Sequence, residues 1–364
     1  MASIVAADVQ HILEAHRLPF DSLHDYRRVW EAAPGSHEEG LGRLIIITPD
    51  IVAQAAKDFI RSGRRTTLGW SMDQLNIANF NRAPIQHHIV PLLNGSAFDD
   101  IYTFNPQQSS QWDGLRHFSA PWPTSDEPDR RLFVSLPSGC QKLLLTSCHQ
   151  YGGVTSEEII DRSSTRIGIH HWADEGICGR GVLLDYASYA KRHGIKYSSF
   201  SDHSIPLSVL LEVAREQNDL QFRRGDILLI RIGLIQEWEN TMTAEEKQAY
   251  AESSTPKHAG VEGTEEMLRW IWNSGFAAVA GDSMSFEVYP PQESYARGEA
   301  QGVKGVFMHE VLLAGWGMPV GELLDLDKLS ALCESEGRWD FFLSSAPFKM
   351  PGGVSSPPNC MAFF

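Results

Sequence analysis

A short polar stretch near residue 110 contains the residue types that hold metals and move protons. It reads QQSSQWDGLRH and runs from Gln107 to His117. Asp113 supplies a carboxylate and His117 an imidazole four residues later, and both groups serve as metal ligands or as general acids and bases. Where two further histidines would complete a metal cluster, the chain carries Gln107 and Gln111. Because an Asp-x-x-x-His pair alone is a weak signal, the surrounding elements must decide what the stretch does.

The first half of the chain predicts helices followed by irregular strands. Apolar positions at helical spacing over residues 8–33, interrupted by Pro19, predict two short helices. The β-branched run at 44–47 predicts a short buried strand, and Pro49 predicts the start of a helix that ends near Arg61. Frequent Gly, Pro and Asn over residues 67–145 predict strands joined by long loops. The polar stretch is therefore expected in one of these loops.

The second half alternates strand and helix signals more regularly. Strands are predicted at 181–185, 226–231, 277–280 and 339–345, and helices at 205–217, 264–273, 307–313 and 323–332. This mixture predicts an α/β fold without a clean βαβ repeat. No glycine-rich phosphate loop follows a predicted strand and no GxSxG turn is present, which argues against a nucleotide-binding fold and an α/β-type serine hydrolase.

Composition narrows the function classes further. Of the 364 residues, 42% are hydrophobic and 21% charged, which predicts a globular chain with a sizeable core. The formal net charge is −15 and no Lys/Arg run occurs, so nucleic acids and anionic membranes are not expected as partners. Five cysteines without a CxxC pair argue against a disulfide framework and a zinc ribbon. Without a membrane-length apolar run or a signal-type N-terminus, a cytoplasmic location is expected.

The polar stretch resembles the signature of the cyclase family of metal-dependent hydrolases, which includes bacterial kynurenine formamidase and isatin hydrolase. That signature is His-x-x-x-His-x-Asp-x-x-x-His, and its positions here hold Gln107, Gln111, Asp113 and His117. Further segments resemble the family in the same order along the chain: 179–185, 224–231, 281–283 and 351–357. The resemblance runs from about Leu41 to the end, and the longer N-terminal region resembles the fungal-type branch.

The resemblance implies a fold and an assembly. It implies the swivelling β/β/α cyclase-type fold, an α/β architecture with a mixed sheet or barrel-like core and outer helices. Residues 41–364 would form a single domain, preceded by an N-terminal helical extension over residues 1–40. Members of the family usually assemble, so a homodimer or homotetramer is expected.

The resemblance also implies a set of site residues. His309 and Glu322 resemble the late His/Glu ligand pair of the family, so they join Asp113 as metal ligands. Gln107 and Gln111 occupy the remaining ligand positions. His117 would be the acid/base that, with Asp113, carries the catalysis. Metal at such a site polarises a carbonyl and activates water.

The two glutamines change what the site is expected to hold. A carboxamide offers only its carbonyl oxygen, a harder and weaker donor than imidazole, which favours Mn²⁺, Mg²⁺ or Ca²⁺ over Zn²⁺. A metal-free pocket is the alternative, in which Gln107 and Gln111 bind substrate and His117 moves protons with Asp113 or Glu322. An inactive site is the third outcome.

These residues support three hypotheses for function. The first is a hydrolase of an amide, lactam or lactone bond in a small aromatic or secondary-metabolite substrate. The second is a metal-independent cyclase, lyase or dehydratase acting on a natural product, and the third is a non-catalytic small-molecule binder. Trp112, Trp70 and His171 are candidate substrate-binding residues, although core packing is the alternative for both tryptophans. His203 and His258 are expected in surface loops.

Overall fold

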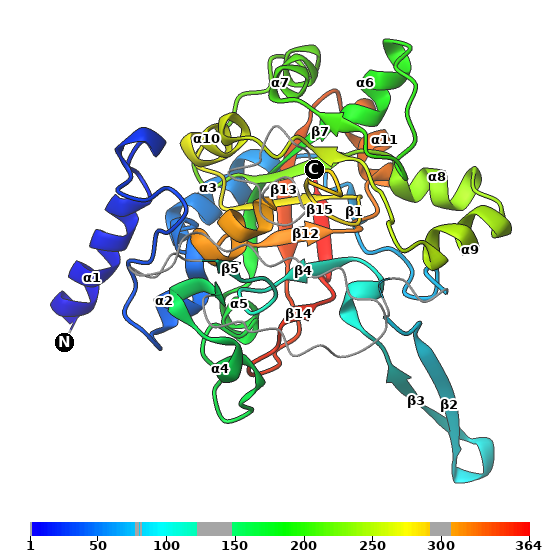
Figure 1. The fold of residues 1–364 in the computed structure, drawn as a ribbon, viewed down its shortest axis with the longest axis horizontal. Helices are drawn as coiled ribbons and strands as arrows, with labels where there is room; N and C mark the ends of the chain where they lie inside the picture. The colour runs from blue at the N-terminus through cyan, green and yellow to red at the C-terminus, as the bar shows by residue number, and fades with distance from the viewer. Residues whose placement is uncertain (1, 77–79, 81, 122–147, 292–306) are drawn as a thin grey trace.

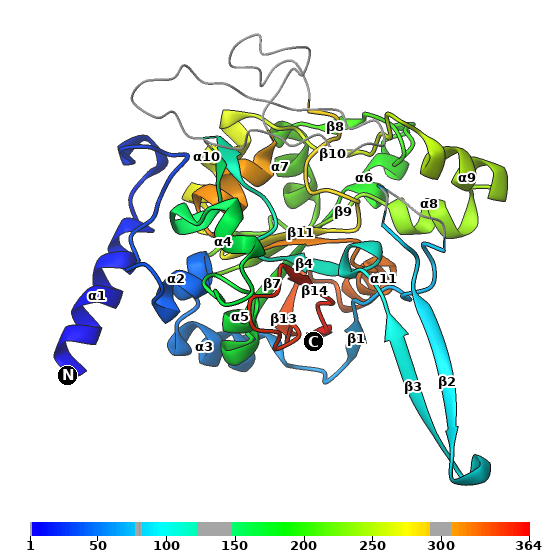
Figure 2. The ribbon, with the colours of Figure 1, turned by 60° about the horizontal axis from the view of Figure 1, so that its bottom comes forward.

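The centre of the molecule is a curled mixed sheet, shown in Figures 1 and 2. The computed structural model describes residues 2–76, 80, 82–121, 148–291 and 307–364, and their side chains from residue 9 onward except that of Pro121. In this described part nine strands lie in one sheet, in the order β1 (Arg65–Thr67), β15 (Cys360–Phe363), β13 (Asp340–Ser345), β7 (Ile177–Asp185), β9 (Ile227–Arg231), β11 (Ala278–Gly281), β12 (Val320–Glu322), β4 (Gln111–Asp113) and β14 (Ser355–Ser356). Strands β7, β9, β11 and β12 run parallel, and the remaining neighbours pair antiparallel.

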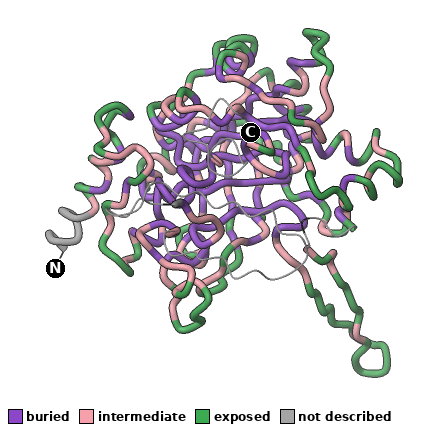
Figure 3. The backbone as a smooth tube through the Cα atoms, viewed as in Figure 1, coloured by how far each residue is buried: buried purple, intermediate pink, exposed green. Residues whose placement is uncertain are grey.

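Both faces of the central strands are buried, which explains their continuous apolar sequences. Along β9, Leu228 and Ile230 pack into one core cluster, whereas Ile227 and Leu229 pack into the cluster on the opposite face. Figure 3 shows the same burial through the centre of the molecule. The strands predicted at 181–185, 226–231, 277–280 and 339–345 are therefore confirmed, with shifts of a few residues at their ends.

Helices cover the sheet and extend from it. The α-helices are α1 (Ala2–Ala15), α2 (His37–Leu41), α3 (Pro49–Phe59), α4 (Ser156–Ile160), α5 (His170–Glu175), α6 (Tyr186–Arg192), α7 (Leu207–Glu216), α8 (Leu234–Asn240), α9 (Ala244–Glu252), α10 (Glu265–Asn273) and α11 (Asp327–Glu336). The single-turn and π elements are η1 (Phe20–Ser22), η2 (Gly42–Ile46), η3 (Leu93–Gly95), η4 (Pro106–Gln108), η5 (Tyr151–Gly153) and η7 (Glu310–Gly315). Helices α7 and α10 supply the core on one face of the sheet. The mixed α/β fold expected from the sequence is confirmed.

Three small two-stranded sheets lie outside the main one. They pair β2 (Gln86–Leu92) with β3 (Ala97–Thr103), β5 (Ala120–Pro121) with β6 (Cys148–His149), and β8 (Ser204–Ile205) with β10 (Gly260–Val261). The β2–β3 hairpin projects away from the body of the molecule (Figures 1 and 2). The expectation of strands and loops over residues 67–145 is confirmed as far as Pro121, and the rest of that range, including Cys140, lies outside the described residues. The loop predicted for the polar stretch is wrong, because Gln111–Asp113 forms strand β4 and pairs with β12.

Two predicted elements differ from the structure. The strand predicted at 44–47 is wrong, because Gly42–Ile46 forms the short helix η2. Ile45 and Ile46 are buried against Ile12 rather than by a neighbouring strand, and a short apolar run does not distinguish these two modes of burial. The helix predicted at 323–332 begins later, at Asp327, so that Glu322 lies on strand β12.

Among the described residues, no helix combines the length and the apolar character needed to cross a bilayer.

Candidate functional site

The pairing of strands β4 and β12 brings the first part of the site together. In this antiparallel pair Gln111 lies opposite Glu322, and Asp113 lies opposite Val320. Because side chains alternate along a strand, Gln111 and Asp113 point to the same face, whereas Trp112 points to the other. Two segments about 200 residues apart thus place an amide and two carboxylates on one buried surface.

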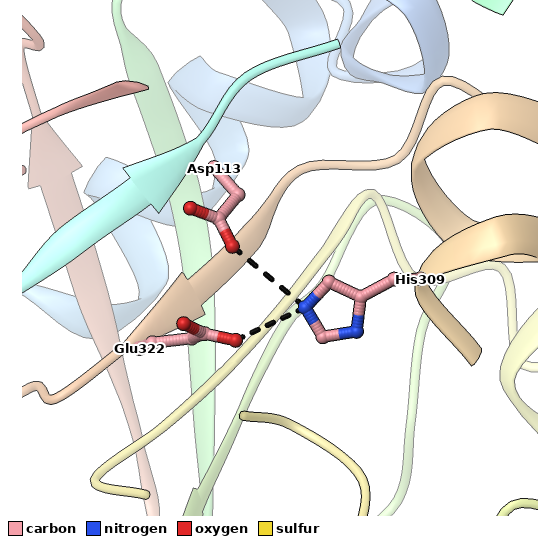
Figure 4. A group of neighbouring side chains, drawn as sticks. All are labelled: Asp113, His309 and Glu322. Atoms are coloured by element: carbon pink, nitrogen blue, oxygen red, sulfur yellow. Dashed lines mark hydrogen bonds and ion pairs between the residues drawn. The ribbon is translucent and has the colours of Figure 1, made fainter. Parts of the chain in front are cut away.

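His309 completes this group from a different element. It lies at the start of the π-helical turn η7, and its imidazole Nε2 is 3.0 Å from Glu322 Oε1 and 3.7 Å from Asp113 Oδ2. One ligand atom from each of the three residues lies within 4.8 Å of the others. Figure 4 shows the two carboxylates turned toward the His309 ring. All three side chains are buried. We call Asp113, His309 and Glu322 the carboxylate–imidazole centre.

Glu287 orients the imidazole of this centre. Its two carboxylate oxygens lie 2.9 and 2.8 Å from His309 Nδ1, and it also accepts a hydrogen bond from the His309 backbone N–H. A carboxylate on Nδ1 fixes the imidazole so that Nε2 faces the centre. Glu287 follows strand β11 in an extended segment that bridges to Val261. Its role was not foreseen, because no local motif marks a residue that reaches the site only through the fold.

Gln107 and Gln111 connect the two carboxylates through their amides. The Gln111 Nε2 group donates to Glu322 Oε2 at 2.7 Å and to Gln107 Oε1 at 2.8 Å. Gln107 in turn donates from Nε2 to Asp113 Oδ1. Both glutamines are buried, so the structure brings together the positions that the sequence analysis singled out.

His117 lies at the rim of the centre. It follows β4 in a tight turn, and its Nε2 is 3.7 Å from Asp113 Oδ2. Its side chain is 19% exposed, whereas that of Asp113 is fully buried. His117 is therefore the member of the group with access to a molecule arriving from solvent.

The ionisable groups strongly influence one another. Burial would raise the pKa of Asp113, but His117, His309 and the Gln107 amide outweigh it and hold this pKa below its usual value. Burial, followed by the Asp113 charge, raises the pKa of Glu322 to about 7. Burial opposes a charge on His309, yet Glu287 and the other carboxylates raise its pKa well above the ordinary value. Burial lowers the pKa of His117.

These residues fit a divalent cation. With His309 protonated and Glu322 neutral, the negative charges of Asp113 and Glu287 still exceed the positive charge of one imidazolium, and uncompensated buried charge is costly. Within the described residues, Asp113 Oδ2 and Gln111 Oε1 are buried acceptors without a hydrogen-bond donor. Asp113 and Glu322 would hold the ion together with His309, whose Nε2 would give up its proton on binding, and the unpaired Gln111 Oε1 would complete a donor set that is mainly oxygen.

The side chains of the three candidate substrate-binding residues contact residues outside the carboxylate–imidazole centre. Trp112 is fully buried in the core, where its ring packs against Gly321 and its Nε1 donates to Ser345 Oγ at 2.9 Å, so the core-packing alternative holds for it. Trp70 donates from Nε1 to Glu239 and lines a separate cavity of about 400 Å³ with Ser109 and Ser110.

His171 lies on helix α5, where its ring packs on Gly40 and its Nδ1 is 3.5 Å from His37 Nδ1. The structure does not bring it to the centre.

His258 corrects one expectation. It was predicted in a surface loop, but it is buried, with 2% of its surface exposed. Its backbone pairs with Tyr289, two residues after Glu287, which places the imidazole near the centre. No periodic pattern surrounds His258 in the sequence, so its burial depended on this long-range pairing.

The fold and the site define a class of protein: a curled mixed α/β sheet that carries a buried carboxylate–imidazole centre. Within that class, residues 68–288 match the family model described as "Putative cyclase", and the chain belongs to this family. The matched range is more than half of the chain and includes Gln107, Gln111, Asp113 and His117, whereas His309 and Glu322 lie beyond its end.

One solved structure agrees with this fold. A crystal structure described as a novel cyclase superposes with a TM-score of 0.69 at 23% identity, covering 90% of this chain and 97% of that one. Isatin hydrolase A from Labrenzia aggregata, bound to benzyl benzoate, has a TM-score of 0.49 at 13% identity and covers 82% of this chain and 93% of its own. No curated protein matches the sequence.

Proposed function

We propose that this protein hydrolyses an amide, lactam or lactone bond in a small aromatic substrate of the secondary-metabolite kind. The observation that carries the proposal is the buried carboxylate–imidazole centre with His117 at its rim. An aromatic ring flanks the centre: Phe118 lies 5.5 Å from the His309 ring and 6.3 Å from the His117 ring, measured between centroids. A flat substrate can pack on such a surface while its carbonyl faces the carboxylates.

A divalent cation held by Asp113, His309 and Glu322 would polarise the substrate carbonyl and lower the pKa of a nearby water. Because amide oxygens from Gln107 and Gln111 replace further imidazoles, Mn²⁺ or Mg²⁺ suits this donor set better than Zn²⁺. Glu287 keeps the Nε2 atom of His309 directed at the centre.

His117 is the proposed proton carrier. Its lowered pKa keeps it neutral near pH 7, so it can accept a proton as the oxygen of water bonds to the carbonyl carbon. The carbon–nitrogen or carbon–oxygen bond then breaks, and His117 returns the proton to the leaving atom. An amide gives a carboxylic acid and an amine, whereas a lactam or lactone opens to one molecule that carries the acid and the amine or alcohol. His117 ends in its starting state.

The test combines metal analysis with turnover of aryl amides, lactams and lactones. We expect the purified protein to carry close to one Mn²⁺ or Mg²⁺ per centre, and turnover to be lost with chelator and restored by Mn²⁺. His117→Ala should lower kcat by roughly 10²–10⁴-fold while the metal content stays unchanged. His193→Ala, on an exposed histidine of the α6 end, is the matched control. Full turnover without metal would refute the metal-dependent form of the proposal.

A second candidate function is a metal-independent cyclase, lyase or dehydratase. The observation that favours it is the pKa of Glu322, about 7, which suits a carboxyl group that gives up and regains a proton near neutral pH. In that case the Gln107–Gln111 amides would bind substrate. Turnover that survives chelator but is lost in both His117→Ala and Glu322→Gln would select this function.

A further inference from the structure

His258 has a polar atom that the fold leaves unused. The imidazole is buried, and its Nδ1 lies 3.3 Å from the Tyr250 hydroxyl. Its Nε2 is buried without a hydrogen-bond partner among the described residues. A buried polar atom without a partner costs free energy, which is recovered if a ligand supplies the missing group.

The protonation of this imidazole depends on its surroundings. The Tyr250 hydroxyl also contacts the Met284 sulfur at 3.3 Å, and a thioether is a weaker acceptor than an imidazole nitrogen. The neutral ring can carry its proton on either nitrogen, and an anion at Nε2 would select the tautomer with the proton there. Burial lowers the pKa of His258 to about 3, so the ring is neutral at ordinary pH. The unused atom can thus donate a hydrogen bond to an anionic acceptor.

A series of aromatic rings joins His258 to the carboxylate–imidazole centre. Its imidazole stacks on Tyr289, with centroids 5.0 Å apart and planes 14° from parallel. Tyr289 stacks on Phe307, which contacts Phe118, and Phe118 lies against His309. Phe80 meets both His258 and Tyr289 edge-on at 6.2 and 6.1 Å. A donor therefore lies at one end of an aromatic wall whose other end is the proposed reaction centre.

Arg82 adds a positive charge beside this wall. Its guanidinium lies 5.5 Å from the centroid of the Phe80 ring, and its Nη1 donates to the Gln107 backbone carbonyl at 3.3 Å. In the described part of the chain it makes no ion pair with an acidic side chain, although the protein carries a net charge of −15. The positive charge of Arg82 acts to lower the pKa values of His117, His258 and Glu322, although burial and nearer charges affect these pKa values more.

We propose that His258 and Arg82 form a recognition subsite for a carboxylate on the aromatic substrate, with Phe80 and Tyr289 flanking the ring. A neutral N–H donor and a guanidinium without an acidic partner complement an anionic acceptor, and such charge-assisted contacts are the stronger hydrogen bonds. The inference rests on the proposed function only in placing the substrate at the carboxylate–imidazole centre. The preferred substrates are therefore aromatic acids whose carboxylate is remote from the bond that breaks.

Binding of a matched pair of probes tests this subsite without any turnover. Equilibrium dialysis of the full-length protein would compare 2-naphthoate with 2-naphthamide, which share a ring system and differ in charge. We expect the wild-type protein to bind the acid at least about tenfold more tightly. Arg82→Gln and His258→Phe should each reduce this ratio toward one, and His258→Gln, which keeps an N–H donor, should retain more of it than His258→Phe.

Controls separate the subsite from general effects of charge and folding. Arg192→Gln removes an exposed arginine paired with Glu216 and should leave the ratio unchanged. Both affinities are measured on the same protein sample, so partial unfolding of His258→Phe does not alter their ratio. If His258→Phe does not fold at all, Arg82→Gln provides the test.

The outcomes are distinct. A ratio near one in the wild-type protein, no saturable binding of 2-naphthoate, or a preference that survives in Arg82→Gln would each overturn the subsite. The last result would be expected if the carboxylate bound a metal at the centre instead. Since no hydrolysis is measured, failure of the proposed reaction and failure of this subsite are read separately.

Discussion

At the residue scale, the geometry around His309 decides what the centre can bind. The imidazole lies between Glu287 on its Nδ1 side and the Asp113 and Glu322 carboxylates on its Nε2 side. An imidazole held in this way presents Nε2 to an ion and keeps its orientation when the ion is absent. Glu287 therefore matters for affinity although it does not contact the ion.

Glu287→Gln is expected to weaken the site without changing the ligands. Loss of such a supporting carboxylate typically lowers metal affinity or activity by about 10–100-fold. Titration of the metal-depleted variant with Mn²⁺, followed by calorimetry, measures this change directly. Glu334→Gln, on the exposed side of α11, is the control. Unchanged Mn²⁺ affinity in Glu287→Gln would show that His309 is not a ligand held by this contact.

The glutamines allow a second test at the same scale. Replacing Gln107 and Gln111 together by histidine converts two amide oxygens into imidazole nitrogens, which Zn²⁺ prefers. We expect the double variant to bind Zn²⁺ more tightly relative to Mn²⁺ than the wild-type protein does, by about tenfold or more. Competition between the two ions, followed by elemental analysis, gives the ratio. An unchanged ratio would place the glutamines outside the ligand set.

At the element scale, the register between β4 and β12 and the start of η7 position the centre. A shift of one residue in β4 would exchange Trp112 with Asp113, placing a carboxylate in the core and an indole in the site. The close fit of Trp112 on Gly321, where a Cβ atom would lie 2.8 Å from the ring, opposes that shift. The site is thus maintained by packing on the opposite face of the strand.

The attachment of helix α1 predicts a dependence of stability on pH. Just after this helix, His16 is buried and its Nδ1 accepts a hydrogen bond from Arg43 Nη1 at 3.1 Å, which requires a neutral imidazole. Burial and the Arg43 charge lower its pKa well below the unfolded value of 6.5. The unfolded chain therefore takes up a proton that the folded chain excludes, and stability is lost as the pH falls below 6.5.

Urea unfolding at pH 6.5 and 5.5 measures this loss. His16 and His258 are both buried with lowered pKa values, and each should lower the free energy of unfolding by about 1 kcal/mol between pH 6.5 and 5.5. His16→Gln, which still accepts from Arg43 but does not titrate, should remove the share of His16 while leaving that of His258. An identical difference between the two pH values in His16→Gln and the wild-type protein would contradict this assignment.

At the scale of the whole molecule, the β2–β3 hairpin carries apolar side chains that the rest of the chain does not cover. It exposes apolar side chains on both of its faces, with Ile89 and Phe98 on one and Ile101 on the other. Figure 3 shows the hairpin as a largely exposed arm. An isolated two-stranded ribbon is at best marginally stable in water. We propose that a second copy of this chain covers the arm, in the homodimer or homotetramer expected from the sequence.

Charged substitutions on the arm test the assembly. Ile89→Asp combined with Phe98→Asp should convert the oligomer to a monomer in light scattering coupled to size-exclusion chromatography, because a buried unpaired charge is costly. Ser96→Asp, at the exposed tip of the hairpin, should leave the mass unchanged. A wild-type protein that is monomeric at micromolar concentration, or a double variant with the wild-type mass, would refute the proposal.

The sequence by itself determined the local features. Apolar runs specified the buried strands, Thr264 set the start of α10 through its side chain, and Pro19 separated helix α1 from the short turn η1. Asp113, His117, His309 and Glu322 were selected by residue type and resemblance, and the structure brings them together. The local elements can be read from the sequence because propensity and capping act over a few residues, whereas the distant site residues were found through the resemblance.

Only the tertiary structure decided how distant residues meet. It placed Trp112 in the core, Glu287 behind His309, and His258 at the end of an aromatic wall. It also made residues 44–46 part of a buried helical turn rather than a strand, because packing against α1 replaced strand pairing. Each of these outcomes depends on contacts between segments far apart in the chain, which residue type and spacing do not encode.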